Sequence, residues 1–104
     1  MRNLDPRQFQ ALLAEPDTVL LDVRTDEELA IAALPGAHHI PLAELGSRIA
    51  ELDPAASIAL LCHHGVRSEM AGRLLERNGF ARVAHLSGGI DAWSQVIDSS
   101  VPRY

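Results

Sequence analysis

The sequence predicts an α/β domain built around a mostly parallel sheet. Short apolar runs alternate along the chain with segments of helical periodicity, an order typical of strands that are linked by helices. The run at 58–61 is wholly apolar, as expected for a central strand that is covered on both faces. No repeat, low-complexity tract or linker interrupts this pattern, so we expect a single domain over residues 1–104.

Two helix-start signals organise the first half of the chain. Asp5 and Pro6 combine a capping side chain with a proline at the first helical position, where its missing N–H costs nothing. Thr25 and Glu28 have the spacing of a capping box, in which each side chain bonds the other's backbone N–H. The predicted elements are a helix from residue 6, a strand at 18–21, a short helix from 26 to about 32, a strand at 38–40 and a helix over 42–52.

The second half of the chain is organised around its only cysteine, Cys62, which directly follows the run 58–61. We expect a loop at 63–68 after it, and then a helix that ends at Asn78 and Gly79. The remaining predicted features are an apolar helix face made of Met70, Ala71, Leu74 and Leu75, a strand at 82–86, and a last helix opened by Gly88 and Gly89.

Composition excludes several classes of function. The net charge of -5 argues against nucleic-acid binding, because proteins that bind the phosphate backbone usually present a basic surface. No apolar run approaches the ~20 residues that are needed to span a bilayer. The first residues lack the apolar stretch of a signal peptide, so we expect a cytoplasmic protein with neither nucleic acid nor membrane as partner.

Cys62 is placed for chemistry. Ligands bind open α/β sheets at the carboxyl ends of their strands, and the N-terminus of the following helix offers unpaired N–H donors and partial positive charge. A thiolate at this place is therefore stabilised. Gly65 allows the loop to curl with a positive φ so that backbone N–H groups point inward, and Arg67 adds a cation. The pattern predicts a nucleophile next to a site for a small anion.

Four segments in the same order resemble those of the rhodanese family. They span residues 18–93, nearly the whole chain. Residues 62–68 resemble the active-site loop C-x-x-G-x-R-S/T, residues 20–24 with Glu28 resemble L-I-D-V-R-x-x-x-E, residues 35–41 resemble P-G-A-x-x-I-P, and residues 86–93 resemble L-x-G-G-x-x-A-W.

The resemblance implies a three-layer fold of about five parallel strands flanked by helices, and a thiosulfate sulfurtransferase activity. The thiolate of Cys62 would take a sulfane sulfur from thiosulfate or a similar donor and pass it to cyanide, a thiol or a protein. It further implies that Asp22 and Arg24 form an ion pair that supports the loop, and that neither cofactor nor metal is needed. The substrate cradle implied by the match consists of His63, His64, Gly65, Val66, Arg67 and Ser68, with Arg67 facing the sulfonate.

Two features depart from the family pattern. Ala33 stands where the family commonly has a histidine before its P-G-A segment. Residues 101–104 resemble the V-P-x-Y ending of rhodanese domains that are fused to adenylyltransferases. We therefore expect this tail to dock a protein partner and to be dispensable for reaction with thiosulfate.

Three other interpretations compete with this one. A phosphatase or arsenate reductase on the same fold needs C-x₅-R, but its arginine would fall at Ser68 and Arg67 comes one residue early. A metal site is disfavoured because adjacent histidines diverge, whereas zinc ligands usually come as spaced pairs. The ligands of such a metal site would be Cys62, His38, His39, His63 and His64. We expect His63 and His64 to be exposed and His85 to be an ordinary sheet residue.

The third alternative is a docking module or sulfur carrier on the rhodanese fold. Such a protein would act with a cysteine desulfurase or an adenylyltransferase, and its turnover of thiosulfate would be incidental. The intact Cys62 loop argues against an inactive docking module, whereas the carrier role stays open. The expected partners are thus a small anionic sulfur donor and a protein donor or acceptor.

Overall fold

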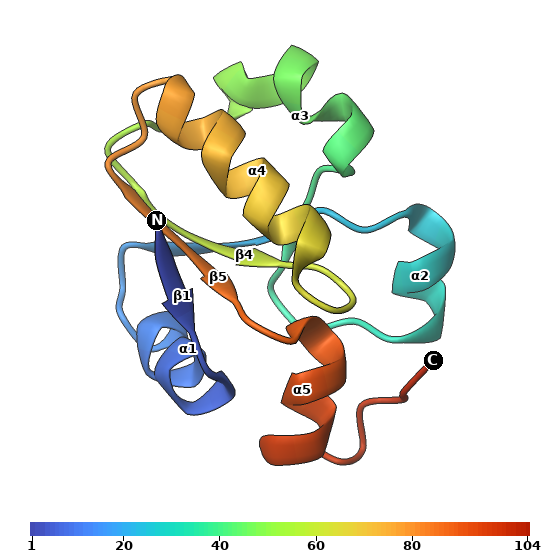
Figure 1. The fold of residues 1–104 in the computed structure, drawn as a ribbon. Coiled ribbons are helices and arrows are strands. Elements are labelled where there is room, and N and C mark those ends of the chain that lie inside the picture. Colours follow the sequence, from blue (N-terminus) through green and yellow to red (C-terminus); the bar gives the residue numbers. More distant parts are fainter.

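Five parallel strands form one sheet in the order β1-β5-β4-β2-β3 (Figure 1). The computed structural model describes all residues from 1 to 104. The α/β fold with about five parallel strands is therefore confirmed. The strands are β1 (Arg2–Leu4), β2 (Thr18–Asp22), β3 (His38–His39), β4 (Ser57–Leu61) and β5 (Arg82–Leu86).

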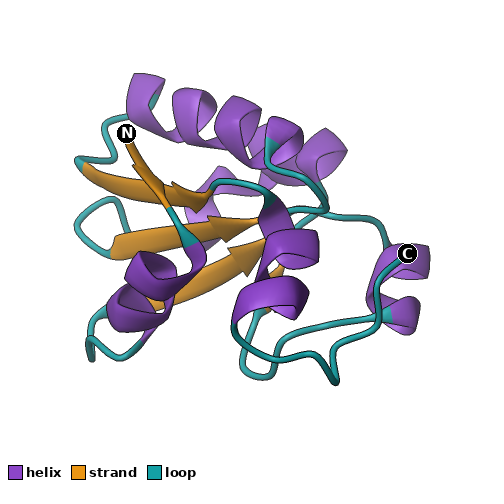
Figure 2. Ribbon diagram, turned by 60° about the horizontal axis from the view of Figure 1, so that its bottom comes forward, coloured by secondary structure: helices purple, strands orange, loops and turns teal.

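Helices cover both faces of the sheet and complete the three layers (Figure 2). On one face lie α1 (Pro6–Leu13) and α5 (Gly89–Val96), and on the other lie α3 (Leu42–Arg48), a 3₁₀ turn (Ile49–Glu51) and α4 (Val66–Arg77). The short α2 (Asp26–Ile31) lies beyond the carboxyl ends of the strands (Figure 2). No helix is both long and apolar enough to cross a membrane.

Both predicted capping signals are confirmed. The Asp5 carboxylate accepts the N–H of Gln8 at 2.8 Å, and the Gln8 side chain accepts the N–H of Asp5 at 3.0 Å. Thr25 and Glu28 make the same reciprocal pair at the start of α2. These local contacts satisfy N–H groups that the first helical turn leaves unpaired.

The side chains of β4 alternate between the two halves of the core. Ala59 and Leu61 pack on the α1 and α5 side, whereas Ile58 and Leu60 pack on the α3 and α4 side. All four are fully buried, which confirms the expected central strand. Cys62 continues the alternation and packs on the α4 side. The thiol therefore lies between the sheet and the helix that follows it.

Three local predictions need correction. The edge strand β1 was not predicted, because it has three residues and only Leu4 is buried. Helix α4 begins at Val66, so Arg67 and Ser68 lie in its first turn and not in the loop. Met70 is 55% exposed and faces solvent instead of the core, which α4 contacts through Ala71 and Leu75.

Candidate active site

Cys62 is the centre of the candidate site. Its side chain is only 1% exposed, and its Sγ accepts the backbone N–H of Gly65 at 3.0 Å. This contact exists because Gly65 adopts φ 108°, which a residue with a side chain rarely adopts. A Cβ at Gly65 would lie 3.2 Å from the backbone nitrogen of Gly88, so space restricts this position as well. The positive φ expected from the sequence is confirmed.

The start of α5 is hydrogen-bonded to the backbone of the Cys62 loop. The N–H of Ile90 donates to the carbonyl of Cys62 at 2.9 Å, and the N–H of Asp91 donates to the carbonyl of His63 at 3.2 Å. A Cβ at Gly89 would collide with that His63 carbonyl. The glycine at this position thus lets one helix terminus fix the backbone of the loop.

Ser68 connects the thiol to a buried histidine. Its Oγ lies 3.4 Å from the Sγ of Cys62, 3.1 Å from the carbonyl of Gly65 and 2.8 Å from Nδ1 of His85. The other ring nitrogen of His85, Nε2, lies 2.8 Å from Oδ1 of Asn3. His85 is a sheet residue as predicted, but no pattern in the sequence indicated this network.

The charge state of His85 depends on its surroundings. Burial lowers its pKa below the ordinary value of 6.5, and the carboxylate of Glu69 acts in the opposite direction. The ring is therefore neutral at neutral pH, with one nitrogen free to accept a hydrogen bond.

Arg67 is bound to a carboxylate. Its two terminal nitrogens lie 2.5 and 2.8 Å from the two carboxylate oxygens of Glu28, so the pair is bidentate. Hydrogen bonding to Arg67 is the main reason why the pKa of Glu28 lies well below its usual range. Arg67 was expected to face a sulfonate, and in the structure its fork ties α4 to α2. Glu28, known from the sequence only as a helix cap and motif residue, thereby belongs to the site.

Asp22 and Arg24 form the expected ion pair. Nη2 of Arg24 lies 2.6 Å from Oδ2 of Asp22, and both side chains are fully buried. The same nitrogen donates to the carbonyl of Ala32 at 2.8 Å, which anchors the end of α2. The pair therefore fixes the chain between β2 and α2, one wall of the candidate site.

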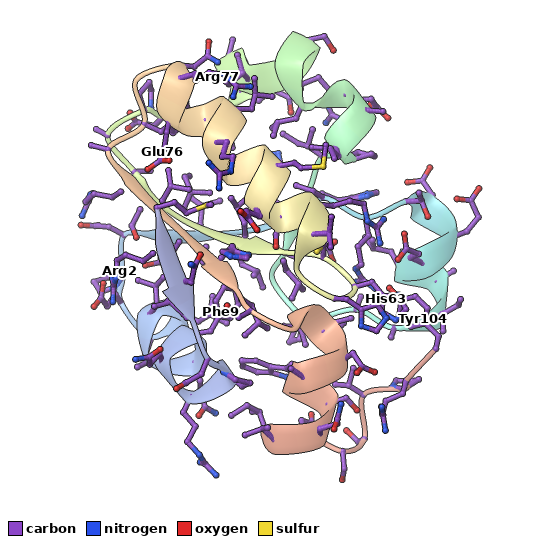
Figure 3. All side chains as sticks on the ribbon, viewed as in Figure 1. Arg2, Phe9, His63, Glu76, Arg77 and Tyr104 are labelled. Carbon is purple, nitrogen blue, oxygen red and sulfur yellow. The ribbon has the colours of Figure 1, made fainter.

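The tail 101–104 packs on the site and does not project from it. The hydroxyl of Tyr104 accepts from Arg24 at 2.8 Å and donates to Glu28 at 2.7 Å. Its ring stacks on that of His63, with centroids 3.8 Å apart and an angle of 8° between the planes (Figure 3). Burial is the main reason why the pKa of Tyr104 rises to about 12.

The two loop histidines differ in exposure. His64 is exposed as expected, whereas His63 is half-buried between His64 and Tyr104, so its prediction as an exposed ring was wrong. Nε2 of His63 is buried and has no hydrogen-bond partner. No three His, Cys, Asp or Glu side chains are grouped so that they could hold a metal ion. Val66, the remaining cradle residue, is exposed at the start of α4.

Comparison with known proteins places this arrangement in a family. The chain matches the rhodanese-like domain family over residues 5–96. It is 32% identical over 96 residues to a protein named sulfurtransferase from Allochromatium vinosum, covering 91% of this chain and 90% of that protein. It is 43% identical over 75 residues to the putative sulfur carrier protein YrkF from Bacillus subtilis, covering 72% of this chain and 40% of YrkF.

A solved structure shares the whole fold. The rhodanese-like domain protein from Staphylococcus aureus superposes with a TM-score of 0.83 at 28% identity, covering 100% of this chain and 99% of that chain. The chain spans less than half the length of the first curated relatives that it matches. On its sequence, its sheet and its cysteine loop, the chain belongs to the rhodanese-like family.

Proposed function

We propose that this chain is a sulfurtransferase that carries a sulfane sulfur on Cys62 as a persulfide. The donor is thiosulfate or a similar small anion, and the acceptor is cyanide, a thiol or a protein. The observation that supports this most is the position of the Cys62 thiol at the N-terminus of α4, where the N–H of Gly65 points at its sulfur.

The reaction balances in two displacements. The Cys62 thiolate attacks the outer sulfur of thiosulfate, the bond between the two sulfur atoms breaks, and sulfite leaves with the electron pair. Cyanide then attacks the outer sulfur of the persulfide, thiocyanate forms, and the thiolate returns. Thiolate and persulfide are both anions, so the partial positive charge of a helix N-terminus stabilises both reacting forms of Cys62.

The neighbouring residues have distinct proposed roles. Residues 63–68 form the cradle, in which the backbone N–H of Gly65 points at the sulfur. We assign Arg67 to the sulfonate end of the donor. The sulfonate oxygens must compete with Glu28 for the guanidinium fork, because that carboxylate accepts both of its hydrogen bonds. The buried pair of Asp22 and Arg24 keeps the wall of the site in place. A phosphatase activity is disfavoured because Ser68 stands where that chemistry needs an arginine.

The experiment uses the fact that Cys62 is the only cysteine. Intact-mass measurement after exposure to thiosulfate should show one added sulfur atom, which cyanide should remove. Cys62→Ser should lose both the adduct and thiocyanate formation. As a matched control, Cys62→Ser combined with Ser47→Cys moves the thiol to an exposed position on α3 and should not restore turnover. Turnover like that of the wild type in Cys62→Ser would disprove the proposal.

A second candidate is a sulfur carrier that is served by a protein. It is favoured by the similarity to YrkF, which is named a putative sulfur carrier, and by Val66 and Met70, which are 69% and 55% exposed on adjacent turns at the start of α4. Apolar surface of this kind beside a reactive thiol suits contact with a protein. Comparing the rate of Cys62 loading by a cysteine desulfurase with the rate by thiosulfate separates the two candidates, because a carrier should load faster from the enzyme.

A further inference from the structure

His85 is a buried titratable residue that the two displacements do not use. It is 4% exposed in the middle of the molecule, and both of its ring nitrogens are hydrogen-bonded at 2.8 Å. One of those bonds leads to Ser68, which in turn contacts the Sγ of Cys62. A buried histidine one hydroxyl away from a reactive thiol is placed to move its proton.

The hydrogen bonds that link Cys62, Ser68, His85 and Asn3 can all donate in the same direction. Oδ1 of Asn3 can only accept, so Nε2 of His85 carries the ring proton and Nδ1 is an acceptor. The hydroxyl of Ser68 donates to that Nδ1 and leaves its own oxygen free to accept the S–H of Cys62. The carbonyl of Gly65 competes for the hydroxyl proton, but it is more distant, at 3.1 Å against 2.8 Å.

The surroundings of His85 allow it to hold a proton for a short time. Its ring lines an open pocket of about 270 Å³ together with Glu69 of α4, His64 of the loop and Asn3 of β1. Glu69 is the negative group that favours the charged ring, while burial disfavours it. Cys62 becomes the second negative group once its proton has left.

We propose that His85 is a positioning residue that, through Ser68, takes the proton of the Cys62 thiol before sulfur loading and returns it when the sulfur has left. The inference rests on the proposed function of Cys62. The S–H bond of Cys62 breaks as an O–H bond forms on Ser68, and the original hydroxyl proton of Ser68 bonds to Nδ1 of His85. The products are a thiolate and an imidazolium, and no atom is oxidised or reduced.

The first test is the pH dependence of alkylation of Cys62 by iodoacetamide, which does not depend on any sulfur chemistry. His85→Gln keeps a polar side chain but cannot accept the proton, so alkylation at pH 7 should slow by about a hundredfold. His38→Gln is the matched control, since His38 is half-exposed on β3 and pairs with Glu51 at 3.5 Å. Its profile should equal that of the wild type. A profile of His85→Gln that matches the wild type would overturn the inference.

Loading of Cys62 with sulfur from thiosulfate distinguishes a failure of the His85 relay from a failure of the proposed function. Loading of His85→Gln by thiosulfate should be slow at pH 7 and recover at pH 9, where hydroxide removes the proton without help. Equal slowness at both pH values would mean that His85 only supports the structure, and would refute the relay. If the wild type never gains sulfur, the proposed function fails, while the alkylation profile still decides the relay.

A measurement on the unmodified protein covers the case in which His85→Gln does not fold. The ¹⁵N chemical shifts of the His85 ring should show the Nε2–H form in the resting thiol state. Finding the Nδ1–H form in the resting state would overturn the inference, because Nδ1 could not then accept from Ser68.

Discussion

At the scale of single residues, Arg67 and Glu28 form an ion pair at one side of the candidate site. Their side chains meet in a bidentate contact although the residues lie 39 positions apart in the sequence. The same guanidinium fork is the group that we assign to the sulfonate of the donor.

Arg67 therefore has two roles that substitution can separate. If a sulfonate binds to its fork, Arg67→Ala should lower kcat/KM for thiosulfate by about ten- to a hundredfold, mainly through KM, because a charge-assisted pair of bonds is worth about 1.5–3 kcal/mol. Arg67→Lys should recover only part of this, because a lysine has no fork. Steady-state kinetics with thiosulfate and cyanide measure both values.

Glu28→Gln is the matched variant for Arg67. It keeps the side-chain length at the capping position of α2 but weakens the hold on Arg67, so KM for thiosulfate should fall. The contrary outcome for Arg67→Ala is a lower kcat and melting temperature with an unchanged KM. Arg67 would then only brace α4 against α2, and its role in recognition would have to be abandoned.

Single residues at this site were predictable where their role depends on near neighbours in the chain. Cys62 and Gly65 were identified because a strand end and a helix start flank them directly, and Asp22 and Arg24 are two positions apart. The partner of Arg67 was not predictable in the same way, because only the fold brings Glu28 next to it.

At the scale of elements, the helices with capping signals and the apolar strands were predictable, because their signals lie within each element. The strand β1 and the start of α4 were not. β1 depends on pairing with β5, more than 80 positions away, and α4 begins where the left-handed Gly65 allows it. The contacts of the tail 101–104 with Arg24, Glu28 and His63 were not predictable for the same reason, because these partners are all distant in sequence.

The docked tail can be observed directly, because Tyr104 is the only tyrosine. Its absorbance should titrate near the pKa of about 12 that burial and Glu28 produce, and not near the ordinary 10.0. Deleting residues 101–104 should change KM for thiosulfate, because Tyr104 bonds two residues that line the site. Titration near pH 10 in the folded protein, with kinetics unchanged by the deletion, would show that the tail is detached in solution.

At the scale of the whole molecule, the site is assembled from segments that span the entire chain. Asn3, Glu28, Cys62, His85 and Tyr104 come from five different segments, and the contact of Asn3 with His85 joins residues 82 positions apart. The resemblance to the rhodanese family predicted the order of the segments and the parallel sheet. The resemblance could not predict the polar network, because Asn3 and His85 lie outside the four segments on which the resemblance rests.

This network should also determine how the stability of the whole domain depends on pH. The pKa of His85 is lowered by burial, so below its ordinary value of 6.5 the unfolded chain binds a proton that the folded chain does not. Stability is thus lost as the pH falls from 6.5 towards the folded value. The pKa of Glu28 is lowered by Arg67, so its contribution is complete above the ordinary 4.5 and is lost only at more acidic pH.

The melting temperature should therefore decline in two stages on acidification, which calorimetry between pH 8 and pH 3 can resolve. The first stage, which begins as the pH falls below 6.5, belongs to His85 and should disappear in His85→Gln, whereas Glu28→Gln should reduce only the stage below pH 4.5. For a chain of this length each kcal/mol moves the melting temperature by roughly 4–8 °C, so both stages are measurable. If His85→Gln kept the slope of the wild type just below pH 6.5, burial would not lower the pKa of His85 in the folded protein, and the buried network around Cys62 would not exist in solution.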